Sequence, residues 1–187
     1  MSQIRRAALG LTLALLCLAA TACVPLQPEK QALGLCLSID RLADGQVRVA
    51  IESPVSKGGV KGDNADAPGY TLLAADGATF SDALATLYQA LPYPVSFAQT
   101  RLIVIGLAYA QSDDPRALAL TLDALPGMRP EACLALCLGD GFEYLQKQKA
   151  DLGLLLSKHL DERLAHLRAL AVVPGASLAA MARDLRA

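Results

Sequence analysis

Apolar and polar positions alternate in the first segments that follow the N-terminal apolar stretch of the chain. Residues 33–40 are mostly apolar and end at Asp40. In residues 46–53, apolar side chains at every second position alternate with Arg48 and Glu52, which we expect on the polar side of the strand. A period of two is typical of a β-strand that has one face toward a core. Turn-forming residues 43–45 separate the two runs, so the pattern predicts a β-hairpin.

A strand, a helix and a second strand are predicted next. Residues 70–75 are a candidate strand, and Thr79 stands where the N-cap of a helix would be. Apolar residues follow Thr79 at helical spacing until Pro92, which cannot continue a helix. Residues 101–105 are a continuous apolar run that ends at a glycine, and such a run is typical of a strand buried on both faces.

Helices and strands continue to alternate in the C-terminal half. Pro115 follows two aspartates and predicts the start of a helix. Residues 131–138 are the next candidate strand, and residues 142–149 are expected to form a short polar-faced helix after a Gly-Asp-Gly turn. Leucines at three- and four-residue steps over residues 152–167 predict a long amphipathic helix. Ser177 would cap a last short helix.

This order of elements predicts an α/β fold, with a central mixed β-sheet packed by three or four helices in a single domain after a signal peptide. We expect residues 1–22 to be the signal peptide, residues 23–32 a tether and residues 33–170 the domain. Residues 171–187 would form a terminal helix, which we interpret as the start of a connection to a further domain. The Gly/Asp-rich residues 56–69 lack the residue order of a phosphate-binding loop and predict an irregular loop.

The N-terminal segment has the organisation of an export signal. Arg5 and Arg6 precede a Leu/Ala-rich apolar stretch, and small residues come directly before Cys23. This order is similar to a bacterial lipobox, in which the signal is cleaved and a diacylglyceryl group is transferred to the thiol, so Cys23 is the candidate lipid attachment residue. An uncleaved anchor is the alternative, because residues 7–28 carry no charge and come close to the ~20 apolar residues of a membrane helix. Prolines near the end of that stretch argue against such a helix.

Composition and charge exclude several classes of function. The chain has 187 residues, of which 53% are hydrophobic and 19% charged, so an intrinsically disordered protein is excluded. The formal net charge is −1, which leaves no positive field to hold a nucleic acid. Aromatic residues make up 4% and Trp is absent, so platforms for stacking bases or sugars are scarce.

The cysteines allow three interpretations. On a strand over residues 131–138, Cys133 and Cys137 would share a face about 13 Å apart, too far to bridge each other. Cys36 belongs to another strand and could form a disulfide with one of them in an exported chain. The second interpretation makes all three small buried residues. A zinc site is the third.

No group of residues in the sequence assembles a catalytic centre. His159 and His166 are seven residues apart on one helix, about 10 Å by the helical rise, so they cannot share a metal without other ligands. We expect both on a solvated helix face. The acidic pairs Asp113/Asp114 and Asp161/Glu162 predict a helix start and a solvated face, and no G-x-S-x-G motif occurs. We therefore predict no enzyme activity, no cofactor and no resident metal.

Several of these segments, taken in order, resemble the N-terminal domain of the Ger(x)C family, the lipoprotein subunits of nutrient germinant receptors in endospore-forming bacteria. The resemblance rests on the hairpin LGLCLSIDRLADGQVRVAIESP, on YTLLAADGATFSDALATLYQALPYPVSFAQTRLIVIGLAYAQ and on DDPRALALTLDALPGMRPEACLALCLGDG. The chain departs from the family where Val24-Pro25 replaces Trp-Asp after the candidate lipid cysteine, and where Gln99 replaces a His before the apolar strand.

The resemblance implies a non-enzymatic receptor subunit that supports nutrient-triggered germination. It would be anchored by acylated Cys23 to the outer face of the spore inner membrane and would associate with integral-membrane receptor subunits. Two alternatives compete with this interpretation. One is a generic envelope lipoprotein that binds a solute, and the other is an exported thiol protein that uses Cys133 and Cys137, although these lack the C-x-x-C spacing of redox motifs.

Overall fold

The structure is a computed structural model. It describes four segments of the chain, residues 31–54, 69–148, 155–169 and 177–184. The chain divides into two compact units, residues 1–30 and residues 31–187. All the described elements therefore belong to the second unit.

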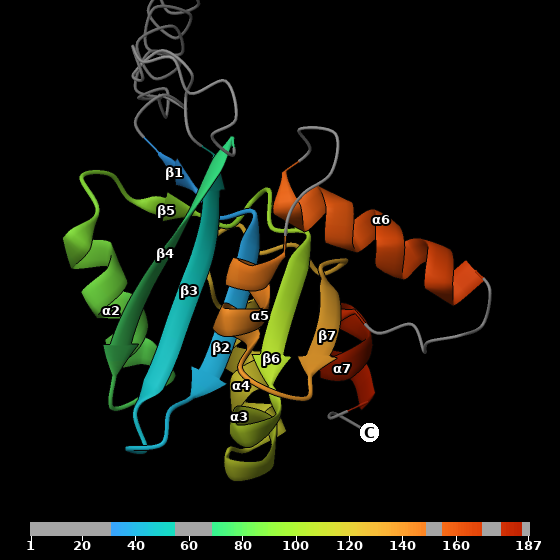
Figure 1. The fold of residues 1–187 in the computed structure, drawn as a ribbon. Coiled ribbons are helices and arrows are strands. Elements are labelled where there is room, and N and C mark those ends of the chain that lie inside the picture. Colours follow the sequence, from blue (N-terminus) through green and yellow to red (C-terminus); the bar gives the residue numbers. More distant parts are fainter. Residues whose placement is uncertain (1–30, 55–68, 149–154, 170–176, 185–187) are drawn as a thin grey trace, which may run out of the picture. The chain divides into compact units, whose positions relative to one another are not determined.

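A mixed sheet of five strands forms the centre of this unit (Figure 1). The strands in chain order are β2 (Cys36–Arg41), β3 (Val47–Pro54), β4 (Tyr70–Gly77), β6 (Leu102–Gly106) and β7 (Cys133–Cys137). Their spatial order is β4-β3-β2-β6-β7, with the first three antiparallel and the last three parallel. Two further strands, β1 (Ala32–Leu33) and β5 (Val95–Ser96), pair in parallel as a separate small sheet. The predicted mixed α/β domain is confirmed.

Six helices pack on the sheet in the described part of the chain, where three or four were expected. They are α2 (Phe80–Ala90), α3 (Leu107–Ser112), α4 (Pro115–Asp123), α5 (Gly141–Lys147), α6 (Leu156–Ala169) and α7 (Leu178–Asp184). Helix α3 was not predicted, because its six residues directly after a buried strand are too few to show a helical period. Strands β1 and β5 were not predicted either, because two residues are too few to show the alternation of a strand.

The predicted hairpin is formed by β2 and β3. Its register pairs Cys36 with Glu52 at one end and Arg41 with Val47 at the other. The connecting turn places Gly45 at a φ of +86°, a backbone conformation that glycine adopts without steric cost. The Asp-Gly signal in the sequence therefore marks the turn correctly.

Helix α2 begins as its sequence predicts. The Thr79 side chain accepts a hydrogen bond from the Asp82 backbone N–H at 3.2 Å, which satisfies one of the free donors of the first turn. Gly77, the last residue of β4, lies so close to the backbone of Asp82 and Ala83 that a Cβ there would overlap the helix. The tight passage from β4 into α2 therefore requires glycine at position 77.

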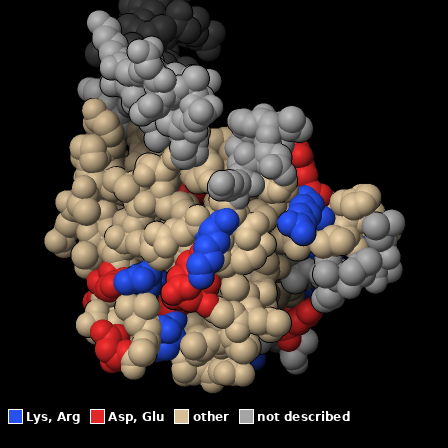
Figure 2. Space-filling view, viewed as in Figure 1, with Lys and Arg blue, Asp and Glu red and all other residues tan. Residues whose placement is uncertain are grey.

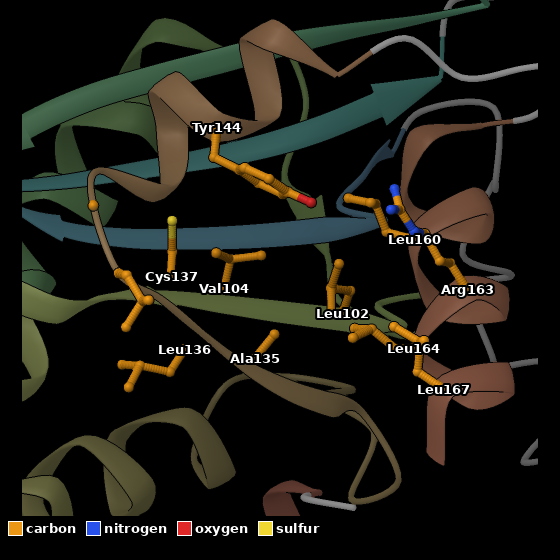
Figure 3. A pocket seen from close by; sticks show the side chains of 12 residues that line it. Leu102, Val104, Ala135, Leu136, Cys137, Tyr144, Leu160, Arg163, Leu164 and Leu167 are labelled. Carbon is orange, nitrogen blue, oxygen red and sulfur yellow. The ribbon is translucent and has the colours of Figure 1, made fainter. Parts of the chain in front are cut away.

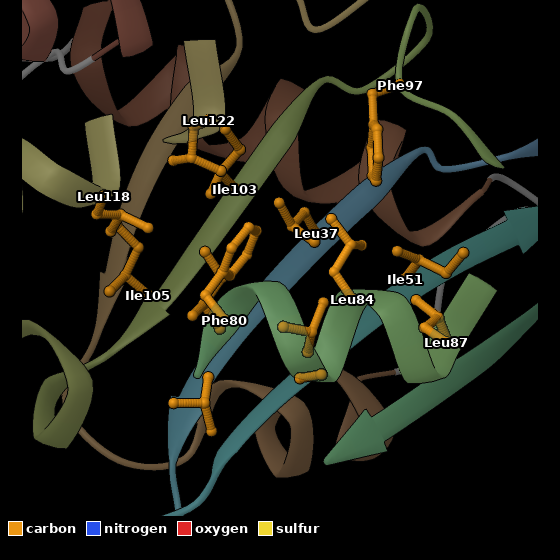
Figure 4. Packing of buried hydrophobic residues seen from close by; sticks show 14 of the residues in the cluster. Leu37, Ile51, Phe80, Leu84, Leu87, Phe97, Ile103, Ile105, Leu118 and Leu122 are labelled. Carbon is orange, nitrogen blue, oxygen red and sulfur yellow. The ribbon is translucent and has the colours of Figure 1, made fainter. Parts of the chain in front are cut away.

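One face of the sheet carries the larger hydrophobic core (Figure 4). Alternate residues of β2, β3 and β6 point to this face, where α2, α3, α4 and α7 cover them. The fully buried large side chains of this cluster are Leu37, Ile39, Ile51, Leu87, Phe97, Ile103, Leu122 and Leu178. Their period of two on the strands and of three to four on the helices is the pattern that predicted these elements.

The opposite face carries a smaller cluster beneath α5 and α6. Its buried members are Cys36, Leu102, Val104, Cys133, Leu145, Leu156 and Leu160. In Figure 1, α5 and α6 lie in front of the sheet and leave part of β6 and β7 between them. This face, named here the α5–α6 face, is thus covered by two helices, and it also carries the buried polar side chains Ser38, Asp40 and Glu52.

The last described helix packs on the same unit. Leu178 is 1% exposed within the larger core, and its N–H donates to the carbonyl of Ala132 at 3.0 Å. Ser177 caps the helix as predicted, by accepting from the N–H of Ala180 at 3.2 Å. Helix α7 thus contributes to the core of this unit. The loop predicted at residues 56–69 lies outside the described residues except for Gly69.

Candidate functional site

A buried carboxylate joins β2 to α5 at the carboxyl end of β2. Asp40 is 2% exposed and accepts hydrogen bonds from the Ser38 hydroxyl at 2.6 Å, the Gly141 N–H at 2.6 Å and the Phe142 N–H at 3.0 Å. The two N–H groups belong to the first turn of α5, where no intrahelical partner exists for them. Asp40 therefore fixes the start of α5 to the sheet across about 100 residues of sequence.

Two glycines make room for this carboxylate. A Cβ on Gly106 would overlap Asp40 Oδ1, and a Cβ on Gly141 would come within 2.9 Å of Val104 Cγ1 and 3.0 Å of Ser38 Oγ. Burial raises the pKa of Asp40, while its hydrogen bonds oppose that shift. Because three donors already occupy its oxygens, Asp40 serves as a structural anchor.

A second buried carboxylate lies at the start of α6. Glu52 is fully buried, and its Oε2 accepts from the N–H of Ser157 at 2.7 Å. The other oxygen, Oε1, has no hydrogen-bond partner among the described residues. Burial raises the pKa of Glu52, and the hydrogen bonds from Ser157 and Leu156 oppose the rise. The positive end of the α6 dipole favours a negative charge at this place.

The sequence pattern assigned Glu52 to the polar side of a half-buried strand. That expectation is wrong, because α6 covers the side of β3 on which Glu52 lies. No local signal distinguishes Glu52 from a solvated strand residue, since its partner Ser157 is 105 positions away. Asp40 was placed correctly at the end of its strand, but its contacts with α5 were not predicted.

An apolar groove opens on the α5–α6 face, between α5 and α6 (Figure 3). Its volume is about 460 Å³. Leu102 and Val104 of β6 and the smaller Ala135 and Cys137 of β7 form its floor. Because β7 places small side chains here, the sheet leaves a hollow that α5 and α6 do not fill.

The walls of the groove come from the two helices. Leu160, Leu164 and Leu167 line it from α6, and Tyr144 lines it from α5. Arg163 is the charged residue of the lining. Among the described residues, its guanidinium has no hydrogen-bond or ion-pair partner. In Figure 3 the hydroxyl of Tyr144 points toward α6, where the guanidinium of Arg163 lies. The groove is thus aliphatic, with one polar group on each of its two helical walls.

A smaller hollow of about 230 Å³ lies at the carboxyl edge of β2 and β6. Ligands of open α/β sheets often bind at this edge, but the charged side chains that line the hollow, Asp40, Arg41 and Asp140, already have partners. Arg41 donates to the Ser112 hydroxyl at 3.2 Å and the Gly45 carbonyl at 2.7 Å, and also pairs with Asp113. Its guanidinium stacks over the Tyr109 ring, 5.6 Å from the centroid. The groove is therefore the better candidate for binding.

The structure resolves the three interpretations of the cysteines in favour of free thiols. Cys36 and Cys133 are buried, Cys137 is half-buried, and none forms a disulfide. The disulfide expected as one alternative is wrong, because Cys36 and Cys133 both pair with Leu102, from opposite sides of β6. Burial raises the pKa of Cys36 and of Cys133, which disfavours the reactive thiolate. Cys137 faces the groove.

The other candidate residues lie as follows. His159 is half-buried and His166 exposed on α6, and among the described residues no three His, Cys, Asp or Glu side chains could hold a metal ion together. Asp114 caps α4 by accepting from the Arg116 N–H at 2.9 Å, which confirms the predicted helix start. Asp161 lies 3.9 Å from Arg101 in a loose ion pair.

The charges on the face in view are mixed in sign (Figure 2). Lys and Arg lie beside Asp and Glu there, and the described residues form no large patch of one sign on this face. The clearest pair joins Arg48 to Asp76 through two contacts of 2.8 Å, which lowers the pKa of Asp76. Arg48 also stacks on Phe142 of α5, 5.5 Å from the ring centroid.

The candidate lipid attachment residue Cys23 lies outside the described residues, as does the whole predicted signal peptide. Among the helices that the structure describes, none is long and apolar enough to cross a membrane. The cleavage of the signal and the acylation of Cys23 stay predictions.

The fold and its site define a class of protein: a mixed α/β domain with an apolar groove, whose buried carboxylates hold helices in place. The family model of the spore germination protein N-terminal domain matches residues 27–186. The chain belongs to this spore germination family, as the sequence resemblance suggested. No curated protein and no solved structure matches the chain significantly.

Proposed function

We propose that this chain is a non-enzymatic subunit of a nutrient germinant receptor. The observation that carries the proposal is the family match over residues 27–186, which spans the entire described domain. The structure supports a non-catalytic role, since the buried acids Asp40 and Glu52 are engaged by backbone N–H groups of α5 and α6. Both carboxylates thus position helices.

The subunit acts at the outer face of the spore inner membrane, held there by acylated Cys23 and by integral-membrane receptor subunits. The lipobox-like order of small residues before Cys23 supports the lipid anchor. The two acyl chains of a diacylglyceryl group hold the domain at the membrane, and contacts with the integral-membrane subunits bring it to the receptor. In this position the domain helps convert nutrient binding into the release of ions and dipicolinic acid.

Nutrient-triggered release of dipicolinic acid from purified spores tests the proposal. A deletion strain should release it slowly in response to specific nutrients and at the parental rate in response to a non-nutrient trigger. A Cys23→Ala complement should restore release only in part, because anchoring is lost. Identical release in the deletion strain and its parent would contradict the receptor role and favour a generic envelope lipoprotein.

A further inference from the structure

The groove on the α5–α6 face exposes apolar surface that the fold itself does not cover. Its aliphatic lining continues onto Leu138, which directly follows β7 and is 82% exposed. Proteins seldom expose a large contiguous apolar surface to water, and such a surface often marks a binding site. A volume of about 460 Å³ lies within the range of small-molecule sites.

The position of the hollow follows from residue size on β7. On the core face of this strand, Leu134 packs against the larger cluster. On the α5–α6 face, Ala135 and Cys137 are small, and the leucines of α6 stand along one wall. Figure 3 shows Leu164 and Leu167 on α6 beside Leu102, with Tyr144 opposite. The space so enclosed is lined by carbon on its floor and on both walls.

The two polar groups of the groove select the head of a ligand. Arg163 carries a full positive charge without a partner among the described residues. The Tyr144 hydroxyl points toward it in Figure 3. A guanidinium and a hydroxyl together can donate to the two oxygens of a carboxylate in charge-assisted hydrogen bonds. The complementary ligand is therefore anionic at one end and apolar along the rest.

The lining also disfavours an extended peptide. The floor offers side chains of Leu102, Val104 and Ala135 and no polar side chain that could satisfy peptide N–H and C=O groups. Burying such groups without partners costs free energy. An unbranched hydrocarbon chain carries no polar group to satisfy, so it fits this lining better.

We propose that the groove between α5, β7 and α6 binds a single aliphatic chain that ends in a carboxylate. The hydrocarbon chain lies on Leu102, Val104 and Ala135 against the leucines of α6, and the carboxylate meets Arg163 and Tyr144. This assignment rests on the groove alone and holds independently of the receptor role.

Titration calorimetry of the full chain with dodecanoate, below its micelle concentration, tests the proposal. We expect saturable binding at one site, with affinity rising about tenfold for each two carbons from octanoate to dodecanoate. Dodecanol and dodecyltrimethylammonium have the same chain with a neutral and a cationic head. Both should bind at least tenfold more weakly than dodecanoate.

Two variants locate the site, and one variant serves as their control. Arg163→Gln should weaken dodecanoate binding about tenfold and leave dodecanol binding unchanged, because only the charged contact is lost. Ala135→Phe should abolish binding of both by filling the groove. Arg183→Gln removes an exposed guanidinium from α7, on the other face of the sheet, and should change neither. Circular dichroism shows whether each variant is folded. Because Arg163 is exposed, its substitution should leave the fold intact, so Arg163→Gln is the decisive variant.

Peptide mapping of alkylated thiols gives an independent readout. Dodecanoate should slow the alkylation of Cys137, which lines the groove. Equal affinity for dodecanoate, dodecanol and the ammonium compound would overturn the proposal, as would dodecanoate binding that survives Ala135→Phe. Binding to phosphatidylglycerol vesicles without any binding of dodecanoate would assign the apolar surface to membranes and would equally overturn it.

Discussion

The two faces of the central sheet bury their residues in different ways. The core face packs large aliphatic and aromatic side chains under four helices. The α5–α6 face places Ser38, Asp40 and Glu52 in the interior and leaves the groove open between two helices. Both faces belong to the same strands, so a strand that holds the fold together on one side can present a binding surface on the other.

The α5–α6 face has a smaller hydrophobic cluster than the core face, and it holds its helices in place through buried carboxylates as well. Asp40 fixes the start of α5 and Glu52 fixes the start of α6, each through backbone N–H groups that the helix itself cannot satisfy. Helix α2 on the core face uses its own N-cap, Thr79. On the α5–α6 face the sheet supplies the acceptors, which ties the two walls of the groove to the strands beneath.

Matched leucine truncations on the two faces should give the largest contrast. Leu122 is fully buried on α4, so Leu122→Ala should lower the free energy of unfolding by about 3 kcal/mol through lost burial and a cavity. Leu164 is half-buried on α6, so Leu164→Ala should cost about 1 kcal/mol or less. Urea denaturation of both variants measures the difference. Equal losses would mean that the groove wall is packed as firmly as the core.

Removal of the charge on Asp40 should have the next largest effect. Asp40→Asn keeps the size of the side chain but turns an acceptor into an NH₂ group that faces donors. We expect a loss of about 2 kcal/mol, because a hydrogen bond to a charged acceptor is lost and a buried donor is left unsatisfied. Ser81→Ala, at an exposed position of α2, is the control and should change the free energy of unfolding by no more than about 0.5 kcal/mol. An Asp40→Asn loss as small as that of the control would contradict the anchoring role of Asp40.

Glu52→Gln should change how the free energy of unfolding varies with pH more than it changes the free energy of unfolding at any one pH. The pKa of Glu52 is raised on folding, so the folded chain holds a proton more tightly than the unfolded chain. Stability from this group is therefore highest below the unfolded pKa of about 4.3 and falls as pH rises through the folded pKa. Gln cannot titrate, so the variant should lose this part of the slope.

Urea denaturation of wild type and Glu52→Gln at several values between pH 4.5 and pH 8 measures this slope. Asp40 also has a raised pKa and contributes a slope of the same sign, which should remain in the variant. If the two proteins show parallel pH profiles, Glu52 does not titrate differently in the folded and unfolded chains, and its burial under α6 is wrong.

The smallest expected effect is a difference in alkylation rate between the half-buried thiol and the two buried thiols, measured on the wild-type protein. Among Cys36, Cys133 and Cys137, the half-buried Cys137 should be alkylated first in the native protein. Cys36 and Cys133 should react only on unfolding, because both are buried and their pKa values are raised. Iodoacetamide labelling followed by peptide mapping gives the order. Early labelling of Cys133 would show that the edge of the sheet near Ser177 opens in solution.

The hairpin and the start of α2 were predicted well because their signals are local. The turn at Gly45 and the cap at Thr79 depend on neighbours within a few residues, and the burial of β6 follows from its continuous apolar run. The groove could not be predicted, because its floor and walls come from four elements spread over more than 60 residues. Arg163 looks like an ordinary solvated helix residue until α5 and β7 are placed beside it.

The sequence by itself determined the strands, the helices that have clear caps and periods, the class of the fold and its family, since each depends on residue order along the chain. Only the tertiary structure decided what the polar residues of the strands do. Asp40 and Glu52 accept hydrogen bonds from backbone N–H groups more than 100 residues away, and three thiols that could have paired are held apart by strand order. Such contacts depend on which strands become neighbours, and strand order is set by the packing of the whole sheet against its helices.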